Sequence, residues 1–590
     1  MTLPRSRSDF GGRARHLIAN PPVGALGMVA AALGLILAAR SAYYGWLLHR
    51  PMPFWDQWSA IRDYFLFADG RFTATRLFAL HNEHRLVTSR PFFILDGYLT
   101  GLQGWFCTLV IYASLLGLAV TLALQAARAI GDRRSVILLA PVMLGLTWSI
   151  CQFENLSWGF QLAFPFVHWF ALLALIALAE ALTGTRRNLW LAAACLFGFL
   201  TVFSFANGLL LTGAAVAVIV WLRRLDWRCA VFLGCQALWT AGFFYGFARP
   251  QDPNLTQVSA TALDYVAFAL TYLGNPFRLA PQLFLPLGLA IAALFLAASL
   301  SATRQAVLRR EPVDRAVAVL LGLALFVALE AAATSYGRAT IGPLAATASR
   351  YSSASIVMVA ALIAIGWRIS GASRQGRAIV LVGAIAAVAG ANLPPDNLAG
   401  WRGLIDRRDQ AAFALASGVR ADEAVSLIHF SPKGIARDLD RLAAGGLANF
   451  SPEASVYRPP LQALTEAAVA RAPACRVVLG GVAQTSGAIR VRGKVAPPAD
   501  VPGSVSWIVA QGAAGQVLGF TRPLVGRRSP MAPGEVGSAE FDLFLNPARL
   551  GTQDPSTVAL LALLDLKIPG KGRAICRADE LMRGPASVQP

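Results

Sequence analysis

The sequence predicts a polytopic α-helical membrane protein with about eleven transmembrane helices and a C-terminal β-sandwich domain. Three observations predict this class. Hydrophobic residues make up 56% of the 590 residues and charged residues only 14%. Apolar runs of about 20 residues, the length that crosses a bilayer, recur as far as residue 394. Beyond residue 395 these runs stop and a more polar composition begins.

Eleven apolar segments are predicted to cross the membrane. They are residues 24–48, 104–128, 135–151, 161–182, 189–205, 207–222, 229–247, 283–300, 316–334, 351–369 and 378–394. No small-residue cleavage site follows the first segment, so we expect a membrane span there and not a cleaved signal peptide. Residues 24–394 are therefore predicted to form one transmembrane domain.

The arginines predict how these helices are oriented. They recur in the N-terminal tail, residues 1–23, and in every second short loop, whereas the opposite loops are nearly free of basic residues. Such an alternation marks the cytoplasmic side. We expect a bacterial inner-membrane protein with a cytoplasmic N-terminus. The net charge of +20 is interpreted as a topology signal, and no nucleic-acid partner is expected.

An odd number of spans places the long loop 49–103 and everything after residue 395 on the periplasmic side. The remaining outer segments are 152–160, 206–208, 248–282 and 335–350. The apolar stretch ATALDYVAFALTYLG, within loop 248–282, is too short to cross and is expected to lie on the outer surface.

The C-terminal region is predicted to have two parts. Residues 395–474 are expected to form a helical connector, and residues 475–590 a β-sandwich, because six short β-like runs alternate there with turn residues. Cys475 and Cys576 bracket the second part. In an oxidising compartment they are expected to form a disulfide, worth up to about 4–5 kcal/mol for a loop of this length.

The stretch Pro51–Pro91 is the strongest candidate for a functional segment. Apolar residues at 54, 55, 58, 61, 65 and 68 form a helical stripe, which predicts an amphipathic helix in the membrane interface. Asp56 lies in the first turn of this helix, where a carboxylate suits the positive end of the helix dipole.

Polar residues of several outer segments are expected at the same membrane face as Asp56. They are His81, Glu83, His84 and Arg85 in the first loop, Glu154 and Asn155 in the next, and Arg338 and Arg350 in the last. Carboxylates for base catalysis, imidazoles for hydrogen bonding and arginines for an anionic group suit a transferase.

Other residue patterns allow other interpretations. His81, Glu83 and His84 could ligate a divalent metal, but a fourth ligand is not evident and a metal is not favoured. His168, inside the fourth span, is more typical of a hydrogen-bonded core histidine. Glu330, inside the ninth span, is a functional candidate by default, and Arg338 is its expected partner.

This layout resembles the C superfamily of glycosyltransferases (GT-C), polytopic enzymes that use polyprenyl-phosphate-linked sugars. The resemblance rests on Asp56 just after the first span, on the long first outer loop, on about eleven spans and on a C-terminal outer domain. In the arabinosyltransferase-like branch that domain is a carbohydrate-binding-like β-sandwich. Many members have an acidic doublet where this chain has Asp56 followed by Gln57.

The resemblance implies a reaction and roles for residues. Asp56 would be the general base toward the acceptor hydroxyl, with a second acid at Glu83 or Glu154, and Arg338 or Arg350 would bind the donor phosphate. The sugar would pass with inversion to an envelope glycan or lipid, and no cofactor is required. No Gly-rich nucleotide loop is evident in the sequence, which a lipid-phosphate donor does not need.

Three alternatives remain open at the level of sequence. A transporter or flippase for envelope lipids would place functional charge inside the spans and show internal pseudo-symmetry. A polymerase or ligase of lipid-linked polysaccharide would place its decisive residues in a large late outer loop. A non-catalytic assembly protein would be unaffected by a change of Asp56.

Overall fold

The structure of the protein is a computed structural model. It describes residues 23–127, 133–248, 259–277, 280–393, 398–452, 454, 457–485, 487–498, 503–524, 539–551, 558–566 and 573–578. The predicted cytoplasmic tail lies outside the described residues, except for Val23.

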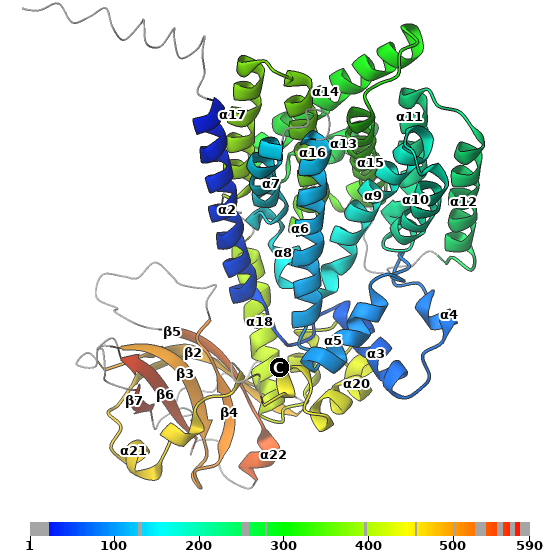
Figure 1. The fold of residues 1–590 in the computed structure, drawn as a ribbon. Helices are drawn as coiled ribbons and strands as arrows, with labels where there is room; N and C mark the ends of the chain where they lie inside the picture. Colours follow the sequence, from blue (N-terminus) through cyan, green and yellow to red (C-terminus); the bar gives the residue numbers. More distant parts are fainter. Residues whose placement is uncertain are drawn as a thin grey trace, which may run out of the picture. The chain divides into compact units, whose positions relative to one another are not determined.

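Most of the described chain is helical (Figure 1). The helices are α2 (Val23–Leu48), α3 (Gln57–Ala68), α4 (Ala74–Leu77), α5 (Arg90–Thr100), α6 (Trp105–Ala127), α7 (Arg133–Thr147), α8 (Phe153–Ser157), α9 (Ala163–Thr183), α10 (Arg187–Val202), α11 (Leu211–Leu222), α12 (Trp227–Phe244), α13 (Ala262–Gly274), α14 (Phe284–Thr303), α15 (Arg315–Arg338), α16 (Ser352–Ser370), α17 (Arg374–Ala391), α18 (Leu398–Ala416), α19 (Asp422–Ser426), α20 (Pro432–Ala444), α21 (Glu466–Ala470) and α22 (Pro547–Leu550). The strands are β1 (Arg476–Thr485), β2 (Ala488–Ala496), β3 (Gly503–Gln511), β4 (Val517–Thr521), β5 (Ala539–Leu545), β6 (Ala559–Leu566) and β7 (Arg573–Ala578).

The chain divides into two compact units. The first unit comprises Met1–His49, Arg71–Phe92 and Phe106–Asp396, and the second comprises Arg50–Gly70, Phe93–Trp105 and Asn397–Pro590. The predicted outer loop 49–103 is therefore split between them. Asp56 belongs to the second unit, whereas the polar residues 81–85 belong to the first.

Eight helical segments among the described residues are long and apolar enough to cross a membrane, as in a polytopic membrane protein. They are Val23–Leu48, Trp105–Ala127, Ser135–Ser157, Gly159–Thr183, Pro281–Leu308, Arg315–Ile341, Ser349–Ser370 and Arg374–Ala391. The predicted count of eleven is not confirmed. The three remaining predicted spans are helical, but α10 and the segment Ala206–Leu222 are short, and α12 includes Arg228 and Gln236, which lower its hydropathy.

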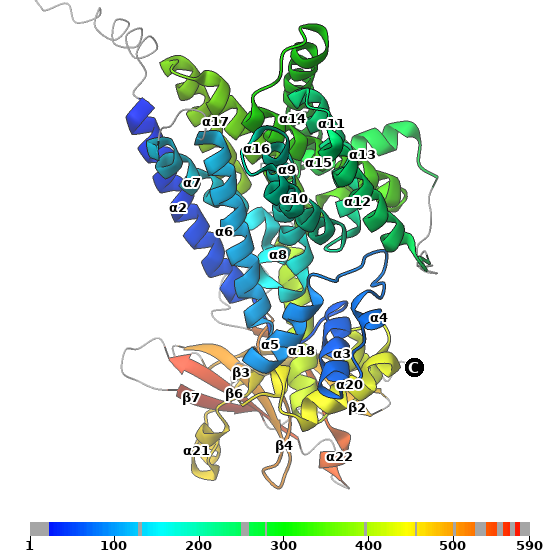
Figure 2. The same cartoon turned by 45° about the vertical axis from the view of Figure 1, so that its right-hand side comes forward.

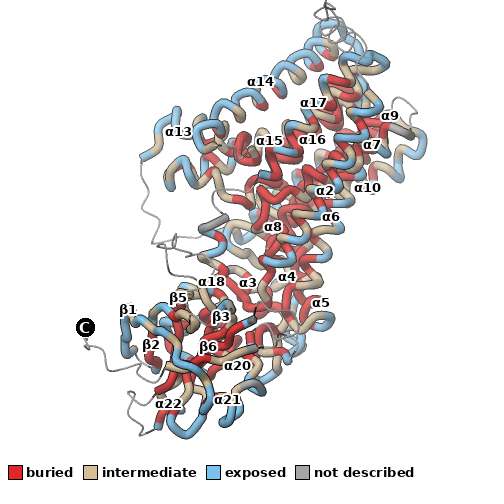
Figure 3. The backbone as a smooth tube through the Cα atoms, turned by 90° about the vertical axis from the view of Figure 1, so that its left-hand side faces the viewer, coloured by how far each residue is buried: buried red, intermediate tan, exposed pale blue. Residues whose placement is uncertain are grey.

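Burial differs strongly among these helices. α9, α15 and α16 are buried on nearly all sides by apolar side chains of the first unit, whereas α14 exposes most of its apolar residues (Figure 3). A helix that is apolar all round and exposed is suited to lipid contact. The short helix α13 begins with a capping box between Thr261 and Asp264.

Helices α2, α7 and α17 lie side by side in the first unit (Figures 1 and 2). Gly34 of α2 lies so close to α7 that a Cβ there would overlap the carbonyl of Pro141. Asn392 closes this group of helices, because its side chain donates to the Gly145 carbonyl at 2.8 Å and accepts from the Ser41 hydroxyl at 2.9 Å. Small residues and a buried amide thus hold these helices together.

Ion pairs join helix ends at one end of the helix bundle. Glu180 near the end of α9 binds Arg315 at the start of α15 at 2.7 Å, and Asp314 binds Arg368 near the end of α16. The arginines involved are those that the sequence assigned to a single membrane face. The candidate site described below lies at the opposite end of α15, around Arg338.

The β strands of the second unit form two antiparallel sheets that share one apolar core. The strand orders are β1-β2-β5 and β4-β3-β6-β7, and both sheets contribute to the core. All six strands predicted from β-like runs are present, and β7 is the seventh. The apolar residues that alternate along β2, such as Val491 and Val495, face this core.

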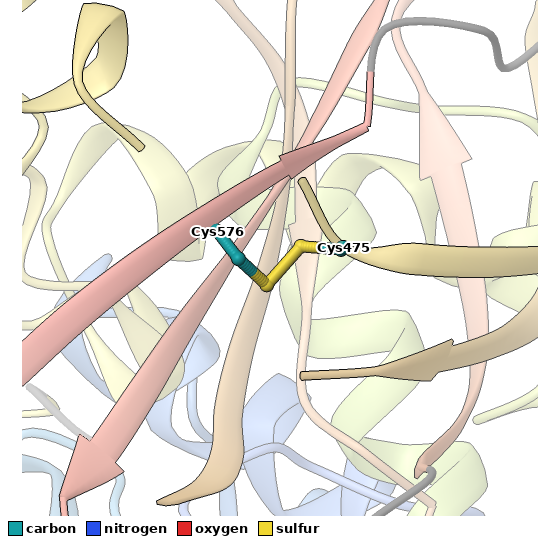
Figure 4. Close-up of a disulfide and its surroundings, with 2 residues drawn as sticks. All are labelled: Cys475 and Cys576. Atoms are coloured by element: carbon teal, nitrogen blue, oxygen red, sulfur yellow. A yellow bond between two sulfur atoms is a disulfide. The ribbon is translucent and has the colours of Figure 1, made fainter. Parts of the chain in front are cut away.

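Cys475 and Cys576 form the predicted disulfide, with an S–S distance of 2.05 Å (Figure 4). Cys475 immediately precedes β1 and Cys576 lies in β7, so the bond joins the two ends of the β region. The other five cysteines of the chain are free thiols on helices or helical turns of the first unit.

Candidate functional site

Residues 81–84 form a tight turn in the first unit. The backbone N–H of His81 donates to the carbonyl of His84 at 2.8 Å, and the reverse bond is 2.9 Å long. Asn82 adopts a left-handed conformation with φ of 51°, which Asn tolerates better than most residues. This turn sets the directions in which Glu83 and His84 leave the backbone.

The His84 ring is fixed from two sides. It stacks on Phe205 with 3.7 Å between ring centroids, and its Nδ1 accepts the backbone N–H of Ala206 at 3.3 Å. Because a backbone N–H can only donate, Nδ1 carries no proton, and the ring proton is on Nε2. Nε2 lies 3.6 Å from Oε1 of Glu83.

Glu83 is held as a carboxylate. Its Oε1 accepts from Arg338 at 3.2 Å. Burial raises the pKa of Glu83, but His84, a backbone N–H and Arg338 together lower it more, so the pKa lies below its ordinary value. Glu83 is therefore better suited to hold a cation or accept a hydrogen bond than to act as a strong base.

Glu154 and Arg350 form a second pair of the same kind. Nη1 of Arg350 lies 3.4 Å from Oε2 of Glu154, and the guanidinium lies over the Tyr351 ring at 5.2 Å. The N–H of Glu154 donates to the Ser349 hydroxyl at 3.1 Å. Both predicted phosphate-binding arginines thus contact a predicted acid from another segment, and both flank the short connection between α15 and α16.

Asn155 and Arg85, both predicted to bind substrate, are buried. Asn155 donates to the carbonyl of Arg350 at 3.0 Å and so positions the backbone of that residue. The guanidinium of Arg85 donates to the carbonyl of Phe243 at 2.8 Å and also to the carbonyls of Phe78 and Tyr245. Burial lowers the pKa of Arg85. These contacts give both side chains a positioning role.

His81 contacts the segment after α8. Its ring meets that of Phe160 edge-on, with 5.3 Å between centroids. Phe160 belongs to the same predicted outer segment, 152–160, as Glu154 and Asn155, so the first unit brings residues of three predicted outer segments together. The predicted site residues of these three segments therefore lie close together within the first unit.

Asp56 lies in the second unit at the N-terminal end of α3. Its side chain makes no capping hydrogen bond to α3 and is half-buried. The preceding Trp55 has φ of 42° and donates its N–H to the carbonyl of Ile428 at 2.8 Å. The chain before Asp56 is thereby fixed on the segment that precedes α20.

The apolar stripe of α3 is buried in protein, which corrects the prediction that it faces the membrane interface. Trp58, Ile61 and Phe65 are all buried, and α3 packs against α20. Arg441 of α20 lies 4.1 Å above the Phe65 ring, and Arg62 of α3 binds Asp438 at 3.1 Å. Periodicity indicated the buried face but not what covers it.

His429 is a candidate that the sequence analysis missed. It lies just before α20, and its Nδ1 accepts the N–H of Ser431 at 3.0 Å. Burial lowers the pKa of His429, and Arg62 lowers it as well, while a hydrogen bond with the Ser431 backbone and the charge of Asp56 oppose this. The ring is therefore neutral at neutral pH. The one signal for His429 in the sequence was its position shortly before Pro432, where α20 begins.

A groove of about 700 Å³ lies between α18 and the outer face of sheet β1-β2-β5 in the second unit. The helix contributes one face, with Asp406, Arg407 and Gln410. The sheet contributes ladders of paired charges, in which Asp542 binds Arg490 at 2.6 Å and Arg492 at 3.2 Å, and Lys494 binds Glu540 at 3.2 Å. Its volume is that of a small-molecule site.

A second polar cluster is buried in the first unit, around Glu330 of α15. Glu330 lies 2.9 Å from Nε2 of His168 on α9 and accepts from Asn207 at 2.8 Å and from the Tyr272 hydroxyl at 3.2 Å. The expected pairing of Glu330 with Arg338 is wrong, because Arg338 binds Glu83. His168 is hydrogen-bonded within the core, as predicted.

Among the described residues, no three His, Cys, Asp or Glu side chains come together as a group that could hold a metal ion. His81, Glu83 and His84 lie in one turn without forming such a group.

The chain was also compared with known proteins. No family model, no curated protein and no solved structure matches it.

Proposed function

We propose that the protein is an inverting glycosyltransferase of a bacterial inner membrane. It transfers a sugar from a polyprenyl-phosphate donor to an envelope glycan or lipid on the periplasmic face. The observation that carries the proposal is the pair of arginines, Arg338 and Arg350, at the two ends of one short connection between apolar helices. Each is held by a glutamate from another segment.

The arginine pairs suit recognition of a lipid phosphate. A guanidinium presents several N–H donors in a plane and binds phosphate through two of them. While the donor is absent, Glu83 and Glu154 neutralise the two cations. On binding, the phosphate takes over part of these hydrogen bonds, and the arginines stabilise the phosphate as it leaves the sugar.

The general base in this proposal is Asp56. A half-buried carboxylate at the start of a helix is able to accept the proton of an acceptor hydroxyl. Attack from the side opposite to the phosphate inverts the anomeric centre. The proton passes to Asp56, the glycosidic bond forms, and the bond from the anomeric carbon to the phosphate oxygen breaks.

The groove of the second unit is a suitable place for the acceptor glycan. Carboxylate and guanidinium groups in alternation offer both acceptors and donors to sugar hydroxyls. The disulfide between Cys475 and Cys576 supports a periplasmic location of this unit, because disulfides persist in oxidising compartments.

The proposal is tested with Asp56→Asn in a deletion strain, with equal membrane levels of each variant verified. We expect the missing envelope sugar to stay missing, because Asn keeps the size of Asp and removes the base. The matched control is Asp440→Asn, an exposed carboxylate of α20 in the same unit. Full restoration by Asp56→Asn would contradict the assigned base.

The donor site is tested separately with purified protein. Arg338→Lys and Arg350→Lys keep the charge and remove the planar fork. Hydrogen bonds between charged groups are worth about 1.5–3 kcal/mol, so each variant is expected to raise the KM for the polyprenyl-phosphate sugar about 10–100-fold. An unchanged KM in both variants would show that the donor phosphate does not bind at the connection between α15 and α16.

A transporter of envelope lipids is the second candidate, favoured by the buried cluster around Glu330. Functional charge inside spans is typical of transporters. Reconstituted vesicles separate the two functions. A transporter moves the labelled lipid-linked sugar across the bilayer without changing it, whereas a transferase joins the sugar to an acceptor on one side.

A further inference from the structure

The hydrogen bonds around His168 and Glu330 determine how many protons this pair holds. Both side chains are only 1% exposed, and both lie in helices predicted to span the membrane. At this low exposure bulk water does not hydrogen-bond to these side chains. Each short contact between them therefore has to contain one proton.

The first contact fixes the proton on one ring nitrogen. Nδ1 of His168 lies 2.7 Å from the carbonyl oxygen of Phe164. A carbonyl oxygen only accepts, so Nδ1 carries a hydrogen. In a neutral ring, Nε2 then has a lone pair and no hydrogen.

The second contact requires one more proton. Nε2 of His168 lies 2.9 Å from Oε2 of Glu330. A neutral ring and a carboxylate would bring two lone pairs together at this distance. The contact is a hydrogen bond only if the ring is an imidazolium that donates to a carboxylate, or if a protonated carboxyl donates to the neutral ring.

The other carboxyl oxygen does not carry this proton. Oε1 of Glu330 accepts from Asn207 at 2.8 Å and from the Tyr272 hydroxyl at 3.2 Å. With two donors directed at Oε1, the exchangeable proton lies between Oε2 and Nε2. Both allowed forms have the same composition, the same net charge of zero and one bound proton.

We infer that His168 and Glu330 form a binding site for a single proton within the membrane-spanning part of the first unit. This site goes beyond the proposed glycosyl transfer and does not depend on it. Binding converts a neutral imidazole and a carboxylate, with net charge −1, into a hydrogen-bonded pair of net charge zero. Release of the proton leaves an uncompensated charge in a buried site, which is unfavourable.

Few other ionisable groups surround the pair among the described residues. The hydroxyl of Tyr272, in α13, donates to Glu330. The ring of Tyr351, just before α16, packs against the Tyr272 ring with 5.4 Å between the two centroids. α11 packs against α9 and α15 and has no ionisable side chain. α10, which packs along α9, carries Arg187 and Cys195, and Arg187 binds Asp226 at a helix end.

The charged groups of α9, α15 and α16 also lie near helix ends. Glu180 binds Arg315, Arg368 binds Asp314, and Arg338 binds Glu83. α12, which also contacts α9, carries Arg228 near its start, where it binds Asp226, and the thiols of Cys229 and Cys235. Among the described residues, the ionic partner of His168 is thus Glu330, and that of Glu330 is His168. Asn207 is the partly exposed member of the cluster, and its neighbour Ala206 donates to His84.

The site is tested on the full-length protein in lipid nanodiscs at pH 8, where free His and Glu side chains hold no proton. Histidine is labelled with ¹⁵N, which gives only six residues to resolve. Glu330→Gln identifies the signals, because a Gln amide reproduces the donor of the protonated carboxyl. Glu311→Gln, an exposed carboxylate, is the matched control.

The wild-type protein is expected to show one of two signatures at pH 8. One is a His168 ring with both nitrogens protonated. The other is a neutral ring protonated on Nδ1, together with an infrared band of a protonated carboxyl that Glu330→Gln removes and Glu311→Gln retains. A neutral ring without that carboxyl band, or a ring protonated on Nε2 alone, would overturn the inference.

If Glu330→Gln does not fold, the pH dependence of unfolding tests the same site. The unfolded chain loses this proton as the pH rises past the ordinary histidine pKa of about 6.5, whereas the folded pair retains it. The unfolding constant of the wild-type protein and of Glu311→Gln should therefore rise about tenfold per pH unit above that value. A pH-independent unfolding constant would contradict the site. Neither readout involves glycosyl transfer, so either proposal can fail without the other.

Discussion

The first unit contains two histidine–glutamate pairs that differ in burial and in geometry. His168 and Glu330 are 2.9 Å apart and each 1% exposed, whereas His84 and Glu83 are 3.6 Å apart and 14% and 41% exposed. The buried pair is surrounded by apolar helices and two neutral donors. The exposed pair shares its carboxylate with Arg338.

The difference shows that the same two residue types can form unlike sites. In the buried pair, Nδ1 faces a carbonyl, so the ring has to be a donor there and the pair retains a proton. In the exposed pair, Nδ1 accepts a backbone N–H, so the ring proton lies on Nε2, 3.6 Å from Glu83. The backbone group at Nδ1 thus decides which protonation state each pair adopts.

The largest expected effect is that of Glu330→Ala. It leaves the Tyr272 hydroxyl and the His168 ring buried without their partner in α15, and breaking a buried pair costs about 3–5 kcal/mol. Unfolding by SDS in mixed micelles, compared between the wild type and this variant, measures the loss. The same change at the exposed Glu311 is the control. A loss as small as the control's would mean that the two histidine–glutamate pairs do not differ as described.

Arg85→Lys should have the next largest effect. The lysine keeps the charge but cannot reach three carbonyls, and hydrogen bonds to charged groups contribute about 1.5–3 kcal/mol. The same unfolding assay applies. Because Arg85 holds the chain next to His84, the ¹⁵N signals of His84 should shift while those of His168 stay in place. Movement of both sets would show that the two pairs are not independent.

Phe205→Leu should have a smaller effect, confined to the exposed pair. It removes the ring on which His84 stacks, and aromatic pairs contribute about 0.5–1.5 kcal/mol beyond area burial. The preference of the His84 proton for Nε2 should weaken, which the ¹⁵N signals report. Phe326→Leu is the matched change at the buried pair, where the ring contacts His168 edge-on at 6.1 Å. It should leave the proton of His168 in place.

Glu83→Gln should have the smallest effect on stability, below about 1 kcal/mol, because the pair with Arg338 is exposed to solvent. The folded-state pKa of Glu83 is lowered. Its contribution is therefore complete above the unfolded pKa, about 4.3, and is lost as the pH falls through the folded-state pKa. The wild type and the variant should converge in acid. The exposed pair thus weakens toward low pH and the buried pair toward high pH, and pH responses of the same sign would refute the comparison.

The sequence predicted the elements better than it predicted their partners. Apolar runs located the helices, alternation located six strands, and the positions of Cys475 and Cys576 predicted their disulfide. These features depend on local pattern and on compartment. Span number was less predictable, because α10 and α11 are apolar but too short to cross by length alone.

The candidate site shows why partners are harder to predict. Glu330 was expected to bind Arg338, eight residues further along the same helix, yet its partner His168 is 162 positions away. The stripe of Trp58, Ile61 and Phe65 was expected to face lipid, yet α20 covers it. In both cases the sequence shows that a group needs a partner, and only tertiary structure shows which one.

The disulfide of the second unit makes the chain a reporter of its own topology. Thiols are kept reduced in the cytosol, so this bond persists only if the second unit lies outside it. Cys475 and Cys576 are also the only cysteines of the chain beyond its membrane-spanning half, and the other five belong to the first unit. Maleimide labelling of intact cells before and after reduction therefore reads the side of the membrane directly. No fusion protein or inserted tag is needed, and native protein at its natural abundance is sufficient.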